Sequence, residues 1–174
     1  MDKLKDIIRS IPDFPVKNVT FRDISTLLQD GEAFKEACDR FYEHYKNRKI
    51  DKIAGIEARG FIFGAVLAYH LKVGFIPVRK KGKLPYKTIS EKYSLEYGTA
   101  ELEIHEDAIT KGEKVVIIDD LIATGGTVEA AIRLVERLGG EVEECGFIIE
   151  LPFLKGRDLL KNRKIFSMIS FEGE

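Results

Sequence analysis

Apolar and polar positions along the first half of the chain follow two periods, one typical of helices and one of buried strands. Residues 32–45 place apolar side chains on one face at helical spacing, which predicts an amphipathic helix packed on a core. Residues 53–56 predict a short buried strand, and residues 60–71 are apolar almost all round, as in a helix packed against a sheet. Residues 73–78 predict another strand.

The second half of the chain continues this alternation. Residues 114–118 form a β-branched run typical of the centre of a parallel sheet. Residues 128–138 predict a helix that ends at Gly139 and Gly140, and residues 145–149 predict one more strand. The crossovers are long enough for parallel pairing, so we expect an α/β fold with a parallel twisted sheet and helices on both faces. Ligands of such sheets bind beyond the carboxyl ends of the strands.

Two segments do not follow the alternation. Residues 80–97 are polar and contain Gly82 and Pro85, so we expect a long mobile loop, a feature that is more often functional than idle. Residues 12–25 are irregular. No repeat, low-complexity tract or linker divides the 174 residues, which predicts a single domain over residues 1–174.

Composition narrows the class of partner. The 28 Lys and Arg residues against 29 Asp and Glu residues give a net charge of -1, so no global basic field favours nucleic acid or anionic lipid. The first residues are charged, and no apolar run is long enough to span a bilayer, so we expect a cytoplasmic protein and no membrane partner. Cys38 and Cys145 lack metal-ligand spacing and are expected to be buried thiols.

Residues 119–127, DDLIATGGT, carry the strongest chemical signal because they join an apolar strand to a helix. Gly125 and Gly126 let successive N–H groups converge on an anion, and the helix adds free donors and a positive dipole end. Thr124 and Thr127 add hydroxyl donors. The segment contains no lysine or arginine, so we expect it to hold a monophosphate rather than a triphosphate.

The acid pair Asp119 and Asp120 would repel phosphate oxygens, which indicates a different ligand group. Adjacent carboxylates suit two cis hydroxyls of a ribose, or a Mg²⁺ bound to them. The alternative is that the pair ends a strand and the glycines only turn the chain; the unbroken order of strand, acids, loop and helix favours a ligand site. No G-x-x-x-x-G-K-[ST] occurs and no G-x-G-x-x-G follows a strand, which argues against a P-loop ATPase and a dinucleotide fold.

Residues 115–127 resemble the phosphoribosyl pyrophosphate motif of the type I phosphoribosyltransferase family. Five further segments resemble its adenine-specific members over nearly the whole length: FRDIS at 21–25, GIEARGF at 55–61, RKKGKLP at 79–85, YSLEYG at 93–98 and LKGR at 154–157. The resemblance implies a purine-salvage enzyme that joins adenine to phosphoribosyl pyrophosphate, making AMP and pyrophosphate.

The resemblance also implies a role for each motif. Asp119 and Asp120 would hold the ribose, residues 123–127 would wrap the 5′-phosphate, and residues 57–60 would form a pyrophosphate loop with a strained, often cis, peptide and the charge of Arg59. The substrate-binding residues expected from it are Phe21, Arg22, Glu57, Ala58, Arg79, Lys80, Lys83, Tyr97, Leu121, Ala123, Thr124, Gly125, Gly126 and Thr127.

The base would lie between Phe21 and Leu121, with backbone groups near Phe21 and Arg22 reading its edge. In the family, an acid at the position of Glu96 serves proton transfer at the purine, and Tyr97 helps to close the site. The catalytic residues expected from this resemblance are Arg59, Glu96, Asp119 and Asp120.

The family's assembly is a homodimer in which Arg and Lys at the positions of Arg79, Lys80 and Lys83 reach pyrophosphate, some of them across the interface. Its members carry an N-terminal hood, here about residues 1–30, and a mobile catalytic loop, here about 80–98. Mg²⁺ would be held mainly through substrate, near the acid pair. Two alternatives stay open: transfer to another base such as hypoxanthine, guanine or xanthine, and a regulator that binds phosphoribosyl pyrophosphate without turnover.

Overall fold

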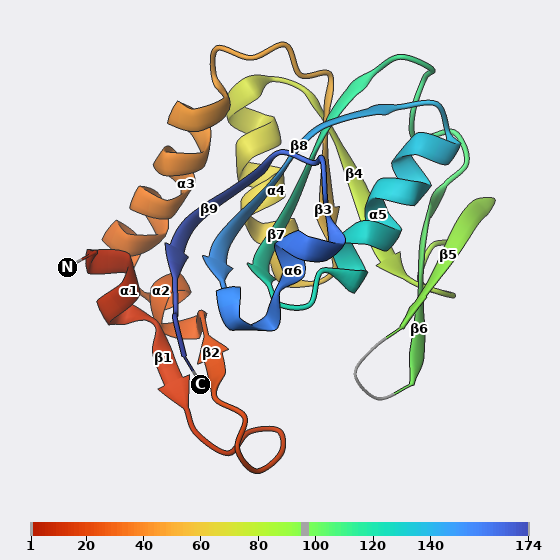
Figure 1. The fold of residues 1–174 in the computed structure, drawn as a ribbon. Helices are drawn as coiled ribbons and strands as arrows, with labels where there is room; N and C mark the ends of the chain where they lie inside the picture. The colour runs from red at the N-terminus through yellow and green to blue at the C-terminus, as the bar shows by residue number, and fades with distance from the viewer. Residues whose placement is uncertain (1, 95–97, 174) are drawn as a thin grey trace.

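A central mixed sheet with helices on both faces forms the protein (Figure 1). The computed structural model describes residues 2–94 and 98–173. The strands of the main sheet are β3 (Lys52–Ile56), β4 (Gly74–Lys80), β5 (Thr88–Ser94), β6 (Thr99–His105), β7 (Lys114–Ile122), β8 (Glu141–Glu150) and β9 (Ile165–Ser170). The helices are α1 (Lys3–Ile7), α2 (Ser25–Gln29), α3 (Gly31–Tyr45), α4 (Arg59–Leu71), α5 (Gly126–Arg137) and α6 (Gly156–Leu159).

The main sheet has the strand order β5-β6-β4-β3-β7-β8-β9. The five strands from β4 to β9 in this order are parallel, whereas β6 pairs antiparallel with both β4 and β5. The predicted α/β class with a parallel core is therefore confirmed, and an antiparallel edge extends it.

Successive residues of β7 show how the sheet builds two cores. Val116 and Ile118 pack into a cluster with α3 and α4, while Val115 and Ile117 pack into a second cluster with α5. All four side chains are fully buried. A strand covered on both faces loses the polar alternation of an exposed strand, which is why this run reads as continuously apolar in the sequence.

The structure corrects the prediction of a loop over residues 80–97, because residues 88–94 form β5. This strand pairs with β6 from Thr88 opposite His105 to Ser94 opposite Thr99. Ile89 and Tyr93 pack toward α5. Glu91 lies between them and accepts hydrogen bonds from two arginines of α5. Because this charged residue is on the inner face, the alternation of apolar and polar residues that is typical of a strand is not visible in the sequence.

The segment at residues 12–25, predicted to be irregular, also contains regular structure. A short strand β2 (Phe21–Asp23) pairs antiparallel with β1 (Arg9–Ile11), and α2 begins at Ser25. We call this N-terminal part, residues 2–29, the hood. Its side chains Leu4 and Leu27 are fully buried in the same cluster as α3.

No helix in the parts of the chain described by the structure has the length and apolar character to cross a membrane.

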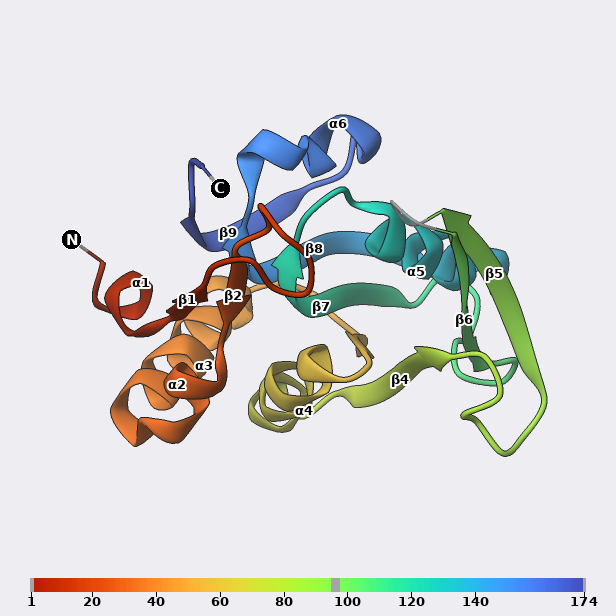
Figure 2. The same ribbon diagram turned by 90° about the horizontal axis from the view of Figure 1, so that it is seen from below.

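The hood and the β5–β6 hairpin flank the end of the sheet at which β7 and β8 finish (Figure 1). Figure 2 looks onto this end and shows the hood on one side, the hairpin on the other, α4 below and α6 above β7. Because β3, β7 and β8 are parallel, their carboxyl ends all point into this space. The fold thus places a ligand pocket where parallel sheets commonly hold one.

Candidate active site

A pocket of about 500 Å³ opens at the carboxyl ends of β3 and β7. It is lined by residues of four predicted motifs together with neighbours that the motifs did not include. The lining residues are Ile56, Glu57, Ala58, Arg59, Lys80, Tyr93, Asp119, Asp120, Leu121, Ile122, Ala123, Thr124, Gly125, Thr127, Val128 and Phe147.

Asp119 and Asp120 stand on β7, inside the strand rather than after it, since β7 continues to Ile122. Asp120 is 2% exposed, and its amide donates to Oδ1 of Asp119 over 2.9 Å. Burial raises the pKa of both carboxyls above the ordinary value of 3.8, and the charge of Asp120 raises the pKa of Asp119 further. A ligand that donates hydrogen bonds to the pair would relieve this cost.

Arg59, the first residue of α4, connects the acid pair with the hood. Its Nε lies 2.8 Å from Oδ2 of Asp120, an ion-pair distance, although this oxygen has no aligned hydrogen-bond donor among the described residues. The guanidinium carbon lies 5.5 Å from the centre of the Phe21 ring. Arg59 therefore spans the space between the expected ribose and base positions.

The phosphate-binding segment forms a tight turn into α5. Gly125 has a φ of 87°, which favours glycine, and α5 begins at the next residue. Thr124, Gly125 and Thr127 all line the pocket. The start of α5, with its free amides, thus lies at the pocket beside two threonine residues, an arrangement suited to a phosphate.

The segment after β3 forms the opposite wall. The peptide between Glu57 and Ala58 is cis. The carboxylate of Glu57 accepts from Arg79 over 2.9 Å and from the amide of Lys80 over 3.1 Å, so it joins this segment to the end of β4. The guanidinium of Arg79 lowers the pKa of Glu57. The segment therefore carries an ionised carboxylate bound to a cation beside the pocket.

Some expected substrate-binding residues do not line the pocket as the described parts of the chain show it: Phe21, Arg22, Arg79, Lys83 and Gly126. The Arg22 guanidinium instead lies 4.2 Å from the centre of the Phe171 ring and donates to the carbonyl of Gly173. Glu96 and Tyr97 lie outside the described residues. Their roles stay predictions from the resemblance.

Comparisons with known proteins agree with this geometry. Residues 24–171 match the family model of the phosphoribosyl transferase domain. The chain is 64% identical to an adenine phosphoribosyltransferase of Desulfosudis oleivorans, over 98% of this chain and 99% of that one. The chain belongs to the adenine phosphoribosyltransferase family.

Solved structures of adenine phosphoribosyltransferases have the same fold. The enzyme from Thermoanaerobacter pseudethanolicus is 53% identical and superposes with a TM-score of 0.94, covering 97% of this chain and 98% of that one. The Saccharomyces cerevisiae enzyme, solved with an imino-altritol bisphosphate and adenine, is 42% identical with a TM-score of 0.90, covering 96% and 97%. The predicted type I phosphoribosyltransferase fold is confirmed.

Several pocket residues of this member of the adenine phosphoribosyltransferase family were not predicted from its sequence. Tyr93 reaches the pocket from the end of β5, and Phe147 reaches it from β8. Tyr93 stood inside a motif already singled out, so its aromatic ring close to Glu96 in the chain was the available signal. Phe147 lies in an apolar strand, and nothing in such a run distinguishes a pocket residue from a core residue.

Proposed function

We propose that this chain transfers the 5-phosphoribosyl group of phosphoribosyl pyrophosphate to adenine, forming AMP and releasing pyrophosphate in purine salvage. One observation carries the proposal: a single pocket brings together a buried acid pair, a glycine-turned phosphate loop and the cations Arg59 and Lys80. These groups match the ribose, the 5′-phosphate and the pyrophosphate of one substrate. The names of the relatives agree with that substrate.

In the reaction, the bond between C1′ and the pyrophosphate oxygen breaks and a bond from C1′ to an imidazole nitrogen of adenine forms. Positive charge develops on the ribose ring, and the pyrophosphate leaves with the electron pair. Asp119 and Asp120 hold the ribose hydroxyls, and Arg59 and Lys80 stabilise the leaving group electrostatically. The proton on the attacking nitrogen passes to a carboxylate, a role that the resemblance assigns to Glu96.

Adenine lies between Phe21 of the hood and Leu121 after the acid pair. The yeast relative was solved with adenine, which supports a base site in this fold. Leu121 lines the pocket, and so does Arg59, whose guanidinium carbon lies 5.5 Å from the centre of the Phe21 ring. Stacking is worth about 1–3 kcal/mol per base but does not select adenine. Selection comes from backbone groups near Phe21 and Arg22, because an oxopurine would leave them unpaired.

Mg²⁺ fits this site when it is held mainly through substrate oxygens. The acid pair offers carboxylate oxygens at the pocket wall, and Oδ2 of Asp120 has no hydrogen bond among the described residues. The described residues contain no cluster of three or more His, Cys, Asp or Glu side chains in a metal-binding arrangement. When bound, Mg²⁺ neutralises negative charge that develops on pyrophosphate.

The deciding experiment measures pyrophosphate release from phosphoribosyl pyrophosphate and Mg²⁺ with adenine, hypoxanthine, guanine, xanthine or orotate in separate reactions. We expect turnover with adenine alone. Turnover with a different base would contradict adenine specificity and keep the reaction class. Binding of phosphoribosyl pyrophosphate without turnover on any base would favour a regulator.

We also propose a cytoplasmic homodimer. Cys38 and Cys145 are both free and buried, which suits a reducing compartment. Tyr69 on α4 is 80% exposed, and Tyr86 next to the basic turn at residues 79–85 is 58% exposed, so aromatic surface is available for a second subunit. Light scattering on the purified protein is expected to give twice the monomer mass of 19.7 kDa.

A further inference from the structure

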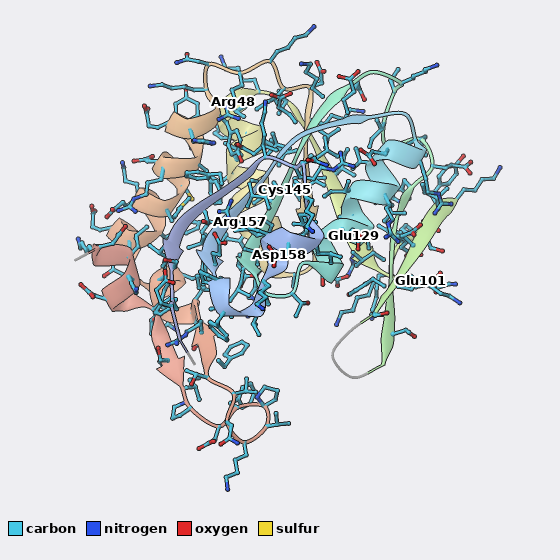
Figure 3. All side chains as sticks on the ribbon, viewed as in Figure 1. Arg48, Glu101, Glu129, Cys145, Arg157 and Asp158 are labelled. Atoms are coloured by element: carbon cyan, nitrogen blue, oxygen red, sulfur yellow. The ribbon has the colours of Figure 1, made fainter. Side chains whose placement is uncertain are left out.

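The LKGR segment, residues 154–157, has no role in the reaction proposed above, yet it lies directly against the phosphate loop. It begins at the last residue of a 3-10 turn (Pro152–Leu154) and contains Lys155, whose φ is 56°. From there α6 runs across the end of β7, and Figure 3 labels Arg157 and Asp158 on it.

Two glycines make this contact a backbone-to-backbone one. A Cβ at Gly156 would overlap the carbonyl oxygen of Ala123, and a Cβ at Gly125 would lie 2.8 Å from the carbonyl oxygen of Gly156. Such distances leave no space for a side chain on either residue. Ala123 and Gly125 belong to the loop that faces the 5′-phosphate, so α6 limits where that loop can stand.

A salt bridge between the half-exposed Arg157 and the buried Glu150 fixes α6 in turn. Arg157 donates from Nε and from a terminal nitrogen to the two oxygens of Glu150, each over 2.6 Å. Glu150 is 8% exposed, and it also accepts from the hydroxyl of Ser167 on β9 over 2.6 Å. The amide of Leu151 donates to the carbonyl of Ile122 over 3.0 Å, which joins the end of β8 to the end of β7. A bidentate salt bridge of this kind restricts the orientation of the Arg157 side chain as well as its distance from Glu150.

We infer that Gly156 and Arg157 are positioning residues for the 5′-phosphate: Glu150 orients Arg157, Arg157 holds α6, and the bare backbone of Gly156 sets the position of the loop at Ala123 and Gly125. The inference rests on the proposed function, which supplies the phosphate. Neither residue touches substrate. Their effect is confined to ligands that carry a 5′-phosphate, and the base site is unaffected.

The test compares AMP with adenosine, which share the base and ribose but differ in the phosphate. Gly156→Ala is expected to weaken AMP binding by about tenfold, the loss of one charged hydrogen bond, while adenosine binding stays within about twofold. Steady-state kinetics are expected to show a raised KM for phosphoribosyl pyrophosphate with little change in the KM of adenine. The matched control is Gly31→Ala, where a Cβ would meet no atom within 4 Å.

Arg157→Lys serves as the second variant because it keeps the positive charge, loses the bidentate guanidinium donor and adds no atom beside the loop. It is expected to show the same selective loss of AMP affinity, which keeps the test valid if Gly156→Ala does not fold. Equal losses for AMP and adenosine, or no loss for AMP in a folded variant, would overturn the inference. Those outcomes with an active wild-type enzyme leave the proposed function intact, whereas an inactive wild type contradicts the proposed function itself.

Discussion

Nε of Arg59 lies 2.8 Å from Oδ2 of Asp120, so the first residue of α4 partly neutralises the charge of an acid within β7. Burial raises the pKa of Asp120, and the guanidinium of Arg59 opposes that rise. The positive charge therefore helps to keep the acid ionised at the pH of the reaction. The pair forms only because the fold brings the segment after β3, which carries Arg59, next to Asp120 within β7.

The first prediction follows from this pair. Removing the charge in Arg59→Gln raises the pKa of Asp120, so the ionised fraction at a given pH falls and the rising limb of kcat/KM moves to higher pH. A pH profile of kcat/KM measures the shift. A variant with lower activity but an unmoved profile would show that Arg59 acts on pyrophosphate alone. Lys35→Gln, at an exposed pair on α3, is the control.

The second prediction concerns Asp120 itself. Asp120→Asn keeps the shape of the side chain but loses the charge that strengthens hydrogen bonds to ribose hydroxyls. The difference is about 1.5–3 kcal/mol, or roughly 10- to 150-fold in turnover. The protein should stay folded, because Arg59 is 43% exposed at its side chain and can be hydrated. Activity assays together with thermal melting test both halves, and full activity would contradict the site assignment.

A third prediction concerns stability as a function of pH. Because the pKa of Asp119 is raised well above 3.8 in the folded protein, the folded state binds this proton more tightly than the unfolded state. Stability linked to Asp119 is therefore complete at acidic pH and decreases as pH rises through the folded pKa. Every tenfold difference in proton affinity between the two states corresponds to about 1.4 kcal/mol.

Asp119→Asn removes this ionisation. We expect the variant to be more stable than the wild type at pH 8, with a difference that shrinks as pH falls toward 4. Urea unfolding at several pH values measures it. A constant difference across the range would show that packing rather than ionisation separates the two proteins.

The parts of the fold that were predictable are those in which one side-chain period dominates. The apolar run in β7 and the amphipathic face of α3 were readable because nothing polar interrupts their inner faces. β5 was missed because Glu91 sits on its inner face and is balanced by arginines of α5, which are distant in sequence. A pattern along one segment carries no information about such partners.

The pocket residues also divide into those that a local motif predicted and those that only the fold brings together. Asp119, Asp120 and the phosphate loop are contiguous, so one local motif was enough to find them. The contact of Gly156 with Ala123 joins positions far apart in the chain, and only the fold brings them together. Arg59 was assigned to pyrophosphate from the resemblance, whereas its approach to Phe21 depends on how the hood packs.

Glu103 provides the fourth prediction, through the basic turn at residues 79–85. It is 4% exposed, and its Oε1 accepts from the amides of Lys83 and Leu84 over 3.0 and 2.9 Å. Losing two hydrogen bonds to a carboxylate is expected to cost about 3–6 kcal/mol of local stability. In Glu103→Ala the amides of residues 83 and 84 should exchange hydrogen faster, and the KM for phosphoribosyl pyrophosphate should rise. Glu106→Ala is the control, since the Glu106 carboxylate lies 3.9 Å from the Lys87 ammonium, a loose surface pair. Unchanged hydrogen exchange in Glu103→Ala would show that Glu103 does not hold the basic turn.

The last prediction tests the base site through Phe21. Its ring contacts Phe14 edge-on at 5.4 Å and has the Arg59 guanidinium 5.5 Å from its centre. An adenine stacked on this ring gains about 1–3 kcal/mol, so Phe21→Ala should raise the KM of adenine about 5- to 150-fold. The KM of phosphoribosyl pyrophosphate should change little, because the phosphate loop lies at the start of α5. Val16→Ala, at a 52% exposed position of the hood, controls for loosening of that segment. Equal effects on both substrates would mean that Phe21 supports the hood rather than the base.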